Sequence, residues 1–343
     1  MAQELFDIVI PLFCTRWNTR AVLEGLTTYY SPRVIHIITL PNEVEPLQNA
    51  SKNWKTSPLH IHNEEIFFQA RTGLTKTKIC EELNLGKSLY NPGWFYQQLL
   101  KLGAFEGIPD LSEWYVVWDS DLLPVETWPL IRQQADMLQY TFALLQHNGW
   151  GNPGIVSKWD TWIRSVLGVE PLTDHEGTFV PHHMWFKQTH LKSFAHQVNT
   201  YFQSDDHWLL LMMRSPNEFG TFSEYWSYVS WVAAQTPTDL SFYPYEQYGT
   251  TTERFFDDGT GLFSTTLRQR LGITSEPANN DDFSPSYEAV ASFIRAEYGT
   301  DALPSSLSFE SSPRHLKKDK ENMHIEEQRS RWNPRMVSIS EAR

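Results

Sequence analysis

The amino-acid sequence predicts an α/β fold: one large domain with a mostly parallel, Rossmann-like sheet flanked by helices. Short apolar runs alternate with segments of helical spacing up to Asp121, which is the order typical of βαβ units. The strand-like runs 7–13 and 33–40 are apolar along most of their length, as in strands that are covered on both faces. A chain of 343 residues with 41% hydrophobic content can bury a core of the required size.

The individual elements follow from periodicity and from helix-capping residues. Before Asp121 we expect strands at 7–13, 33–40, 58–62 and 114–118, and helices at 17–30, 73–85 and 93–104. After Asp121 we expect a strand or helix at 138–147, an extended segment at 178–187, and helices at 155–167, 188–202, 206–214, 222–234 and 285–298. The last helix has Ser284 as its expected N-cap and Gly299 just past its end. Residues 301–343 have mixed charge and no apolar period, so we expect a disordered tail.

Composition excludes several classes of protein. The formal net charge of -13 argues against binding nucleic acid over a broad surface, because such surfaces are basic. Cys14 and Cys80 are the two cysteines and do not have metal-ligand spacing, so we expect neither disulfides nor zinc, and a reducing compartment. The first residues do not resemble a secretion signal, and no apolar run is long enough to span a bilayer. We therefore expect a soluble, cytoplasmic protein without an integral membrane segment.

The most informative motif is Asp119-Ser120-Asp121, directly after the apolar run 114–118. Ligands of open α/β sheets bind at the carboxyl ends of the strands. Side chains two apart on an extended segment point the same way, so both carboxylates can face one Mg²⁺ or Mn²⁺ ion, which prefers oxygen ligands. A pair of solvated loop carboxylates is the alternative interpretation, and the position after a buried strand favours the metal site.

The segment 91–102 opens with turn residues and continues with helical spacing. One face of this helix combines an aromatic ring, two amides and an amine, which suit a sugar or a diphosphate. These residues are Trp94, Gln97, Gln98 and Lys101. The opposite face carries Phe95, Leu99 and Leu102 for packing. An ordinary amphipathic helix with a polar outer face explains the same spacing.

Two further polar positions are candidates for the same site. His182 and His183 are neighbours on an extended segment, so only one of them can reach the carboxylates. We take His183 as the candidate metal ligand, with a structural histidine as the alternative. Glu224 is the candidate base for an acceptor hydroxyl, ahead of Asp205 and Asp206. Its alternative role is to stabilise the first turn of a helix that begins near Ser223.

Taken in order, these motifs resemble a known family. From about Asp7 to Ala234 the chain is similar to GT-A glycosyltransferases, in particular a branch marked by G-W-x-x-Q-Q-x-x-K-L, D-S-D, H-M-x-F and S-E-Y. Here the four motifs occupy 93–102, 119–121, 183–186 and 223–225. The opening I-V-I-P-L at 8–12 looks like the first strand of that fold.

The resemblance implies a nucleotide-sugar donor, a UDP- or GDP-sugar, with Mn²⁺ or Mg²⁺, and transfer of the sugar to the hydroxyl of a carbohydrate acceptor. It implies that Asp121 is the main metal ligand and a catalytic residue, and that Asp119 contacts the metal or the ribose. By the same resemblance, the nucleotide would lie near Pro11 and Leu12 at the end of the first strand, and the nucleoside near Glu64 and Glu65. Residues 1–121 would form the donor-binding half of the domain, and residues 122–300 the acceptor-binding half.

The expected reaction depends on the charge of the leaving group. A cation, with Lys101 nearby, would stabilise the departing nucleoside diphosphate, while Glu224 would take the acceptor proton. A non-catalytic carbohydrate-binding protein that stacks sugars on its 14 tryptophans and 14 tyrosines is the main alternative. A sugar nucleotidyltransferase ranks lower, because residues 13–17 contain no glycine-rich loop after the first strand.

Overall fold

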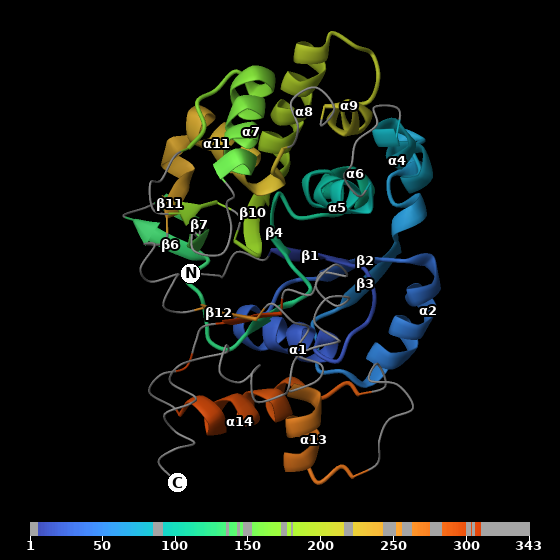
Figure 1. Ribbon diagram of the computed structural model, residues 1–343, viewed down its shortest axis with the longest axis vertical. Helices are drawn as coiled ribbons and strands as arrows, with labels where there is room; N and C mark the ends of the chain where they lie inside the picture. Colours follow the sequence, from blue (N-terminus) through green and yellow to red (C-terminus); the bar gives the residue numbers. More distant parts are fainter. Residues whose placement is uncertain are drawn as a thin grey trace.

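The computed structural model is shown in Figure 1, and its helices and strands confirm the α/β fold with a mostly parallel sheet flanked by helices. The structure describes residues 6–84, 92–134, 137–142, 145–146, 153–172, 177–179, 181–215, 222–242, 252–255, 263–274, 283–299, 303 and 306–309.

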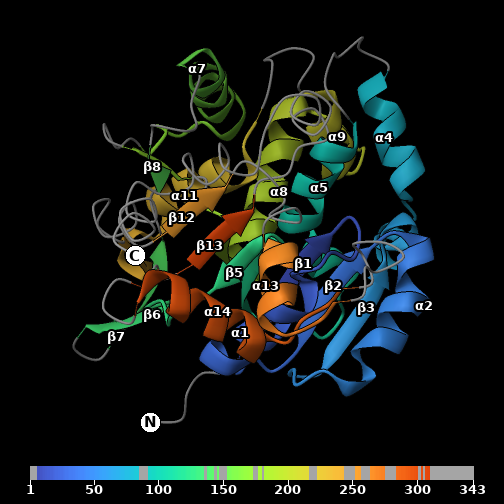
Figure 2. The same cartoon turned by 60° about the horizontal axis from the view of Figure 1, so that its bottom comes forward.

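The central sheet has five strands in the order β10-β4-β1-β2-β3, of which Figure 2 labels β1, β2 and β3 side by side. Their bounds are β1 Asp7–Leu12, β2 Ile35–Thr39, β3 Leu59–Asn63, β4 Trp114–Trp118 and β10 His183–Lys187. Strands β3, β2, β1 and β4 run parallel, and β10 adds to β4 in the antiparallel direction. The carboxyl ends of the four parallel strands therefore lie along one edge, where open α/β sheets bind ligands.

The end of β1 shows how a proline is accommodated in this sheet. Proline cannot donate a backbone hydrogen bond and is avoided in the middle of a ladder. The register of β1 with β4 covers only Asp7 to Val9, so Pro11 lies beyond it, and its partner on β2 is Ile38.

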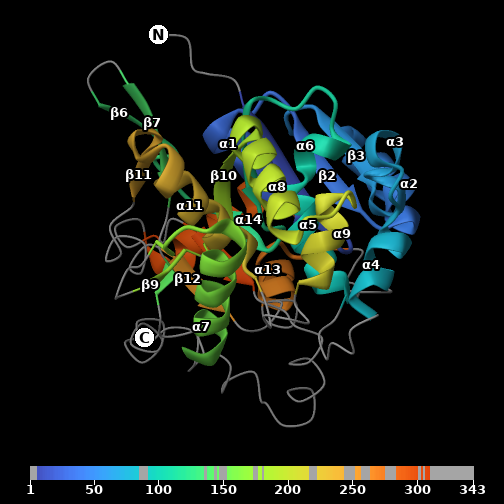
Figure 3. The same ribbon diagram turned by 90° about the horizontal axis from the view of Figure 1, so that it is seen from above.

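Helices cover both faces of the sheet. On the face shown above the sheet in Figure 1, α5 (Pro92–Leu102) contacts β1, and α8 (Gln188–Phe202) contacts β10. Figure 3 shows this layer from above, with α9 (Trp208–Arg214) and α11 (Glu224–Gln235) beside α8. On the other face lies α1 (Thr19–Tyr30), which packs against α14 (Tyr287–Tyr298). The strands β1, β2 and β4 are therefore buried along their whole length, which explains their largely apolar sequences, whereas the edge strand β3 is only partly buried and alternates apolar and polar residues.

The remaining elements extend these layers. The further helices are α2 Pro41–Ala50, α3 Gln69–Thr72, α4 Lys76–Asn84, α6 Ala104–Gly107, α7 Pro153–Trp162 and α13 Thr265–Arg270. The further strands are β5 Leu122–Pro124, β6 Ile131–Gln134, β7 Met137–Phe142, β8 Leu145–Gln146, β9 Gly177–Thr178, β11 Leu240–Phe242, β12 Thr252–Phe255 and β13 Ser306–Phe309. Among the helices that the structure describes, none is long and apolar enough to cross a bilayer.

Four expectations need correction. The helix α2 was not expected, because its polar sequence contains Pro46. The last helix is capped by Ser286, whose side chain accepts a hydrogen bond from Ala289, and not by Ser284. Residues 163–167, expected as the end of an α-helix, form a π-helical turn. The tail prediction is wrong for Ser306–Phe309, which forms the buried strand β13 between β12 and β5; residues 310–343 lie outside the described part of the chain.

Candidate active site

The turn that follows β4 holds Asp119 and Asp121 in place. The backbone N–H of Asp119 donates to the carbonyl of His182 at 2.7 Å, and that of Leu122 donates to the carbonyl of Asp119 at 3.0 Å. The indole N–H of Trp118 donates to the carbonyl of Leu122 at 2.7 Å. Because both ends of the turn are hydrogen-bonded, the backbone from which the two carboxylates project has a fixed conformation.

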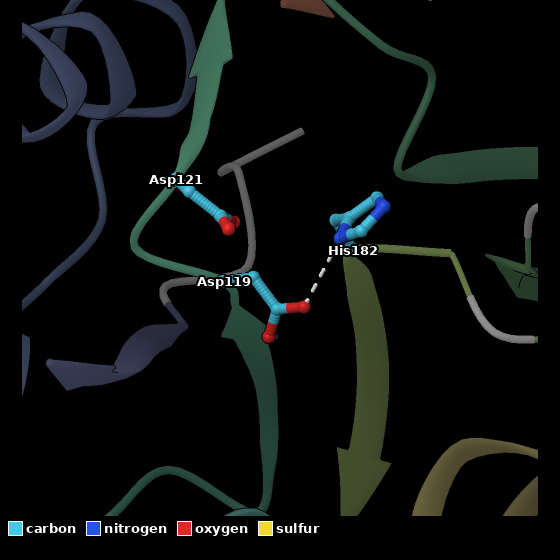
Figure 4. Close-up of side chains that lie close together, drawn as sticks. All are labelled: Asp119, Asp121 and His182. Carbon is cyan, nitrogen blue, oxygen red and sulfur yellow. Dashed lines mark hydrogen bonds and ion pairs between the residues drawn. The ribbon is translucent and has the colours of Figure 1, made fainter. Parts of the chain in front are cut away.

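The pairing of β4 with β10 brings a histidine to this turn. His183 pairs with Trp118, so the preceding residue, His182, lies beside Asp119. The Nδ1 atom of His182 is 3.2 Å from Oδ2 of Asp119. One ligand atom each from Asp119, Asp121 and His182 lies within 4.8 Å of the others. Figure 4 shows the three side chains converging from the end of β4, the following turn and the start of β10.

The prediction for His183 therefore differs from the structure, which places His182 at the carboxylates. Successive residues of a strand face opposite sides of the sheet. The His183 ring stacks on Trp118, with 4.9 Å between ring centroids, and meets the edge of Trp128. Burial and the neighbouring His182 lower the pKa of His183 to about 3. His183 is thus a neutral part of the core, on the face covered by α1.

Lys101 joins the turn that carries Asp119 and Asp121 to the candidate base, Glu224. Its Nζ is 2.8 Å from Oδ1 of Asp119 and 2.8 Å from Oε1 of Glu224, and it lies 4.4 Å from the ring centroid of Tyr225. Burial by itself would lower the pKa of Lys101, but the carboxylates of Asp119 and Glu224 raise it well above the usual value. The sequence suggested that Lys101 serves a diphosphate. In the structure, its ammonium contacts two carboxylates instead.

Asp119 has different partners on its two oxygens. Oδ1 accepts hydrogen bonds from Lys101 and from the hydroxyl of Tyr225, the latter at 3.1 Å. Oδ2 faces His182. Burial would raise the pKa of Asp119, but the charge of Lys101 and the contact with His182 lower it overall. Asp119 is therefore an anion whose Oδ2 is turned toward the Asp121–His182 side.

The start of α11 positions Glu224 in the same place. Ser223 is the N-cap of this helix, and the N–H of Glu224 donates to Oε1 of Gln98 at 3.3 Å. Gln98 is 2% exposed, and its Nε2 atom has no hydrogen-bond partner among the residues that the structure describes. A buried amide donor without a partner is unfavourable unless a ligand or water completes it.

These residues line one pocket of about 190 Å³. Of the predicted site residues, it contains Trp94, Gln97, Gln98, Lys101, Asp119, Asp121 and Glu224. It also contains residues that were not predicted, namely Ser120, Trp159, His182, Ser223 and Tyr225. The sequence does carry a signal for Tyr225, because it follows Glu224 in the S-E-Y motif, but only the fold brings its hydroxyl to Asp119.

Other predicted residues lie outside this lining. Pro11 and Leu12 are buried at the carboxyl end of β1. Glu64 forms an ion pair with Lys76, and Glu65 accepts a hydrogen bond from the hydroxyl of Thr77 at 2.7 Å. All four are at the edge of the sheet where the parallel strands end. The alternative bases are not in the lining either: Asp205 is exposed, and Asp206 pairs with Arg214 at 2.6 Å.

The sequence matches a protein family over most of its length. Residues 7–259 match the model described as "Family of unknown function (DUF6492)". The protein belongs to this family. The family match includes every residue of the pocket. No curated protein matches the sequence.

Solved structures with a related arrangement are distant from this DUF6492 protein. Mouse xyloside xylosyltransferase 1 in its apo form has 10% identity and a TM-score of 0.42, covering 88% of this chain and 97% of its own. Core-mannan synthase A from Aspergillus fumigatus in its Mn/GDP form has 9% identity and a TM-score of 0.42, covering 71% and 73%.

Proposed function

We propose that the protein is a metal-dependent glycosyltransferase of the GT-A type, which moves a sugar from a UDP- or GDP-sugar to a hydroxyl group of a carbohydrate acceptor. The observation that carries the proposal is the single pocket in which Asp119, Asp121 and His182 converge next to Glu224. Carboxylates at the end of a parallel strand supply a cation site, and the carboxylate of Glu224 supplies a base. The motif order noted in the sequence supports the same class.

The donor atoms fit a divalent cation of the Mg²⁺ or Mn²⁺ type. Octahedral ligands at about 2.1 Å from an ion are separated from one another by roughly 3 to 4 Å. The ligand atoms of Asp119, Asp121 and His182 lie within 4.8 Å of one another, and the closest approach of Asp119 to His182 is 3.2 Å. Two carboxylates and one imidazole leave positions for phosphate oxygens. A bound cation would stabilise the charge that develops on the leaving nucleoside diphosphate.

The other pocket residues have distinct proposed roles. Glu224 takes the proton from the acceptor hydroxyl. Gln98 offers its unpartnered Nε2 to an oxygen of the substrate, while Oε1 holds the start of α11. Trp94 is 40% exposed at the pocket and presents a flat apolar surface on which a sugar ring can stack. Together they bind and orient substrate beside the carboxylates.

The proposal is tested by incubating the protein with UDP- and GDP-sugars, Mn²⁺ and a panel of saccharide acceptors, and by measuring release of nucleoside diphosphate. We expect release that EDTA abolishes and that an acceptor accelerates. Asp121→Asn should lower the rate by about a hundredfold or more, because a ligand for the cation is lost. Asp110→Asn is the matched control, since this exposed carboxylate lies outside the pocket lining.

Two results would contradict the proposal. Turnover that survives in Asp121→Asn would remove the metal assignment. Saccharide binding without nucleotide-dependent stabilisation, and without any diphosphate release, would instead favour the non-catalytic carbohydrate-binding protein. Thermal unfolding with UDP or GDP distinguishes the two, because a ligand that binds the folded state raises its unfolding temperature.

A further inference from the structure

The buried ammonium of Lys101 lies on the side of Asp119 that faces away from the candidate cation site. It is 6% exposed and is held between two carboxylates at 2.8 Å each. Ion pairs of this kind place a fixed charge where water does not screen it effectively. A lysine ammonium is positively charged near neutral pH, and here it contacts one oxygen of each carboxylate.

This charge competes with a cation for Asp119. Lys101 binds Oδ1 of Asp119, while Oδ2 is the oxygen that faces His182. Among the described residues that line the pocket, the charged side chains are the carboxylates of Asp119, Asp121 and Glu224 and the ammonium of Lys101. Because Lys101 offsets one of the three carboxylates, the pocket attracts a divalent cation less strongly than its acidic residues alone would.

We propose that Lys101 keeps the cation affinity of the empty pocket low, so that the divalent ion binds tightly only together with a nucleoside diphosphate. This inference rests on the proposed function, and it makes Lys101 a positioning and affinity-setting residue rather than a phosphate ligand. The diphosphate oxygens supply the additional anionic ligands that offset the lysine charge. By linkage, the cation then strengthens nucleotide binding by the same factor that nucleotide strengthens cation binding.

The test measures Mn²⁺ binding by electron paramagnetic resonance of the free ion, with and without UDP or GDP. In the wild-type protein we expect nucleotide to tighten Mn²⁺ binding by about tenfold or more. In Lys101→Met and Lys101→Gln, Mn²⁺ should bind without nucleotide on the order of tenfold more tightly than in the wild type. The further tightening of Mn²⁺ binding by UDP or GDP should be correspondingly smaller in these variants than in the wild type. Lys101→Gln retains amide donors for both carboxylates, so it keeps the test valid where Lys101→Met fails to fold.

Two matched controls separate charge from geometry. Tyr225→Phe removes the hydroxyl donor to Oδ1 of Asp119 without changing charge, and it should leave Mn²⁺ affinity within about threefold of the wild type. Lys187→Met removes a positive charge from the far end of β10, where Lys187 pairs with Asp239, and should leave Mn²⁺ affinity unchanged. Tighter Mn²⁺ binding in the Lys101 variants alone supports the inference.

Weaker or unchanged Mn²⁺ binding in folded Lys101 variants would overturn the inference and leave the proposed function standing. An equal change in Tyr225→Phe would also overturn it, because orientation of Asp119 would then explain the result. If the wild-type protein binds no Mn²⁺ even with nucleotide, the proposed function fails first. The two failures are therefore distinguishable in one set of titrations.

Discussion

His62 on β3 gives the stability of this protein a predictable dependence on acid. Its Nε2 is 3.1 Å from Nδ1 of His36 on the neighbouring strand, and the two rings stack with 5.3 Å between centroids. His36 in turn faces the buried carboxylate of Asp7 at 3.7 Å. Burial, followed by repulsion from His36 and His60, lowers the pKa of His62 to about 4, against 6.5 in an unfolded chain. The change to test is His62→Gln, which retains hydrogen bonding and removes the titration.

The sign and size follow from proton linkage. Because the folded pKa is the lower one, the unfolded state binds more protons between the two values, and stability falls as the pH falls through this window. Above about pH 6.5 the group contributes nothing to the pH dependence. With one pKa unit worth about 1.4 kcal/mol, the loss is about 1.4 kcal/mol at about pH 5.5 and about 2.6 kcal/mol at about pH 4.5. The full shift amounts to roughly 3 kcal/mol below both pKa values.

Urea unfolding of both proteins at about pH 7.5, 5.5 and 4.5 measures this difference, since titrating groups that do not interact with His62 cancel in the comparison. His62→Gln should lose less stability than the wild type on acidification, by the amounts above. Parallel loss in both proteins would refute the reasoning, because it would mean that His62 titrates equally in the folded and unfolded states.

Three further predictions concern the site and its support. His182→Ala should weaken Mn²⁺ binding at least tenfold with little change in unfolding temperature. His183→Ala should retain Mn²⁺ affinity but lower the free energy of unfolding by about 2 kcal/mol or more, because it leaves a cavity beside Trp118. Gln98→Leu should lower kcat/KM by about tenfold, because a substrate partner and the acceptor for the Glu224 N–H are lost. Gly107→Ala should lower the free energy of unfolding by about 1–3 kcal/mol in thermal melts, because a Cβ there overlaps the ring of Phe67.

Each of these has an opposite result that is easy to recognise. The histidine assignment is wrong if His183→Ala, and not His182→Ala, weakens Mn²⁺ binding. A kcat/KM for Gln98→Leu equal to that of the wild type would show that its free amide nitrogen has no substrate partner. An unfolding temperature of Gly107→Ala equal to that of the wild type would mean that the ring of Phe67 moves aside without cost.

Local sequence signals predicted the central part of the fold. The strand 114–118 and the helix 188–202 have the expected bounds, because an unbroken apolar run and a clear helical period are properties of the segment alone. The strand β13 has no such signal. Its four residues become a strand by pairing with β12 and β5, two segments distant in the sequence, so only the tertiary structure identifies it.

The candidate site likewise has features that one short segment predicts and features that depend on the tertiary structure. Asp119, Asp121 and the helix face with Gln98 and Lys101 were predicted, because each follows from the spacing within one short segment. The contacts of Lys101 were not predictable, since they join α5 to the turn after β4 and to α11. A lysine among polar neighbours gives no indication that two carboxylates from elsewhere in the chain will surround it.

The choice between His182 and His183 depends on a single register. Sequence alternation shows that the two rings point to opposite faces, but it does not show which face belongs to which residue. The pairing of His183 with Trp118 decides this, and the rest of β10 holds that pairing in place. Trp185 donates its indole N–H to the carbonyl of Leu130 at 2.8 Å. On the other face, the ring of Phe186 packs against that of Tyr228, with 4.4 Å between ring centroids. A slip of one residue would exchange the two faces and break both contacts, so the aromatic packing of β10 is what delivers His182 to the carboxylates.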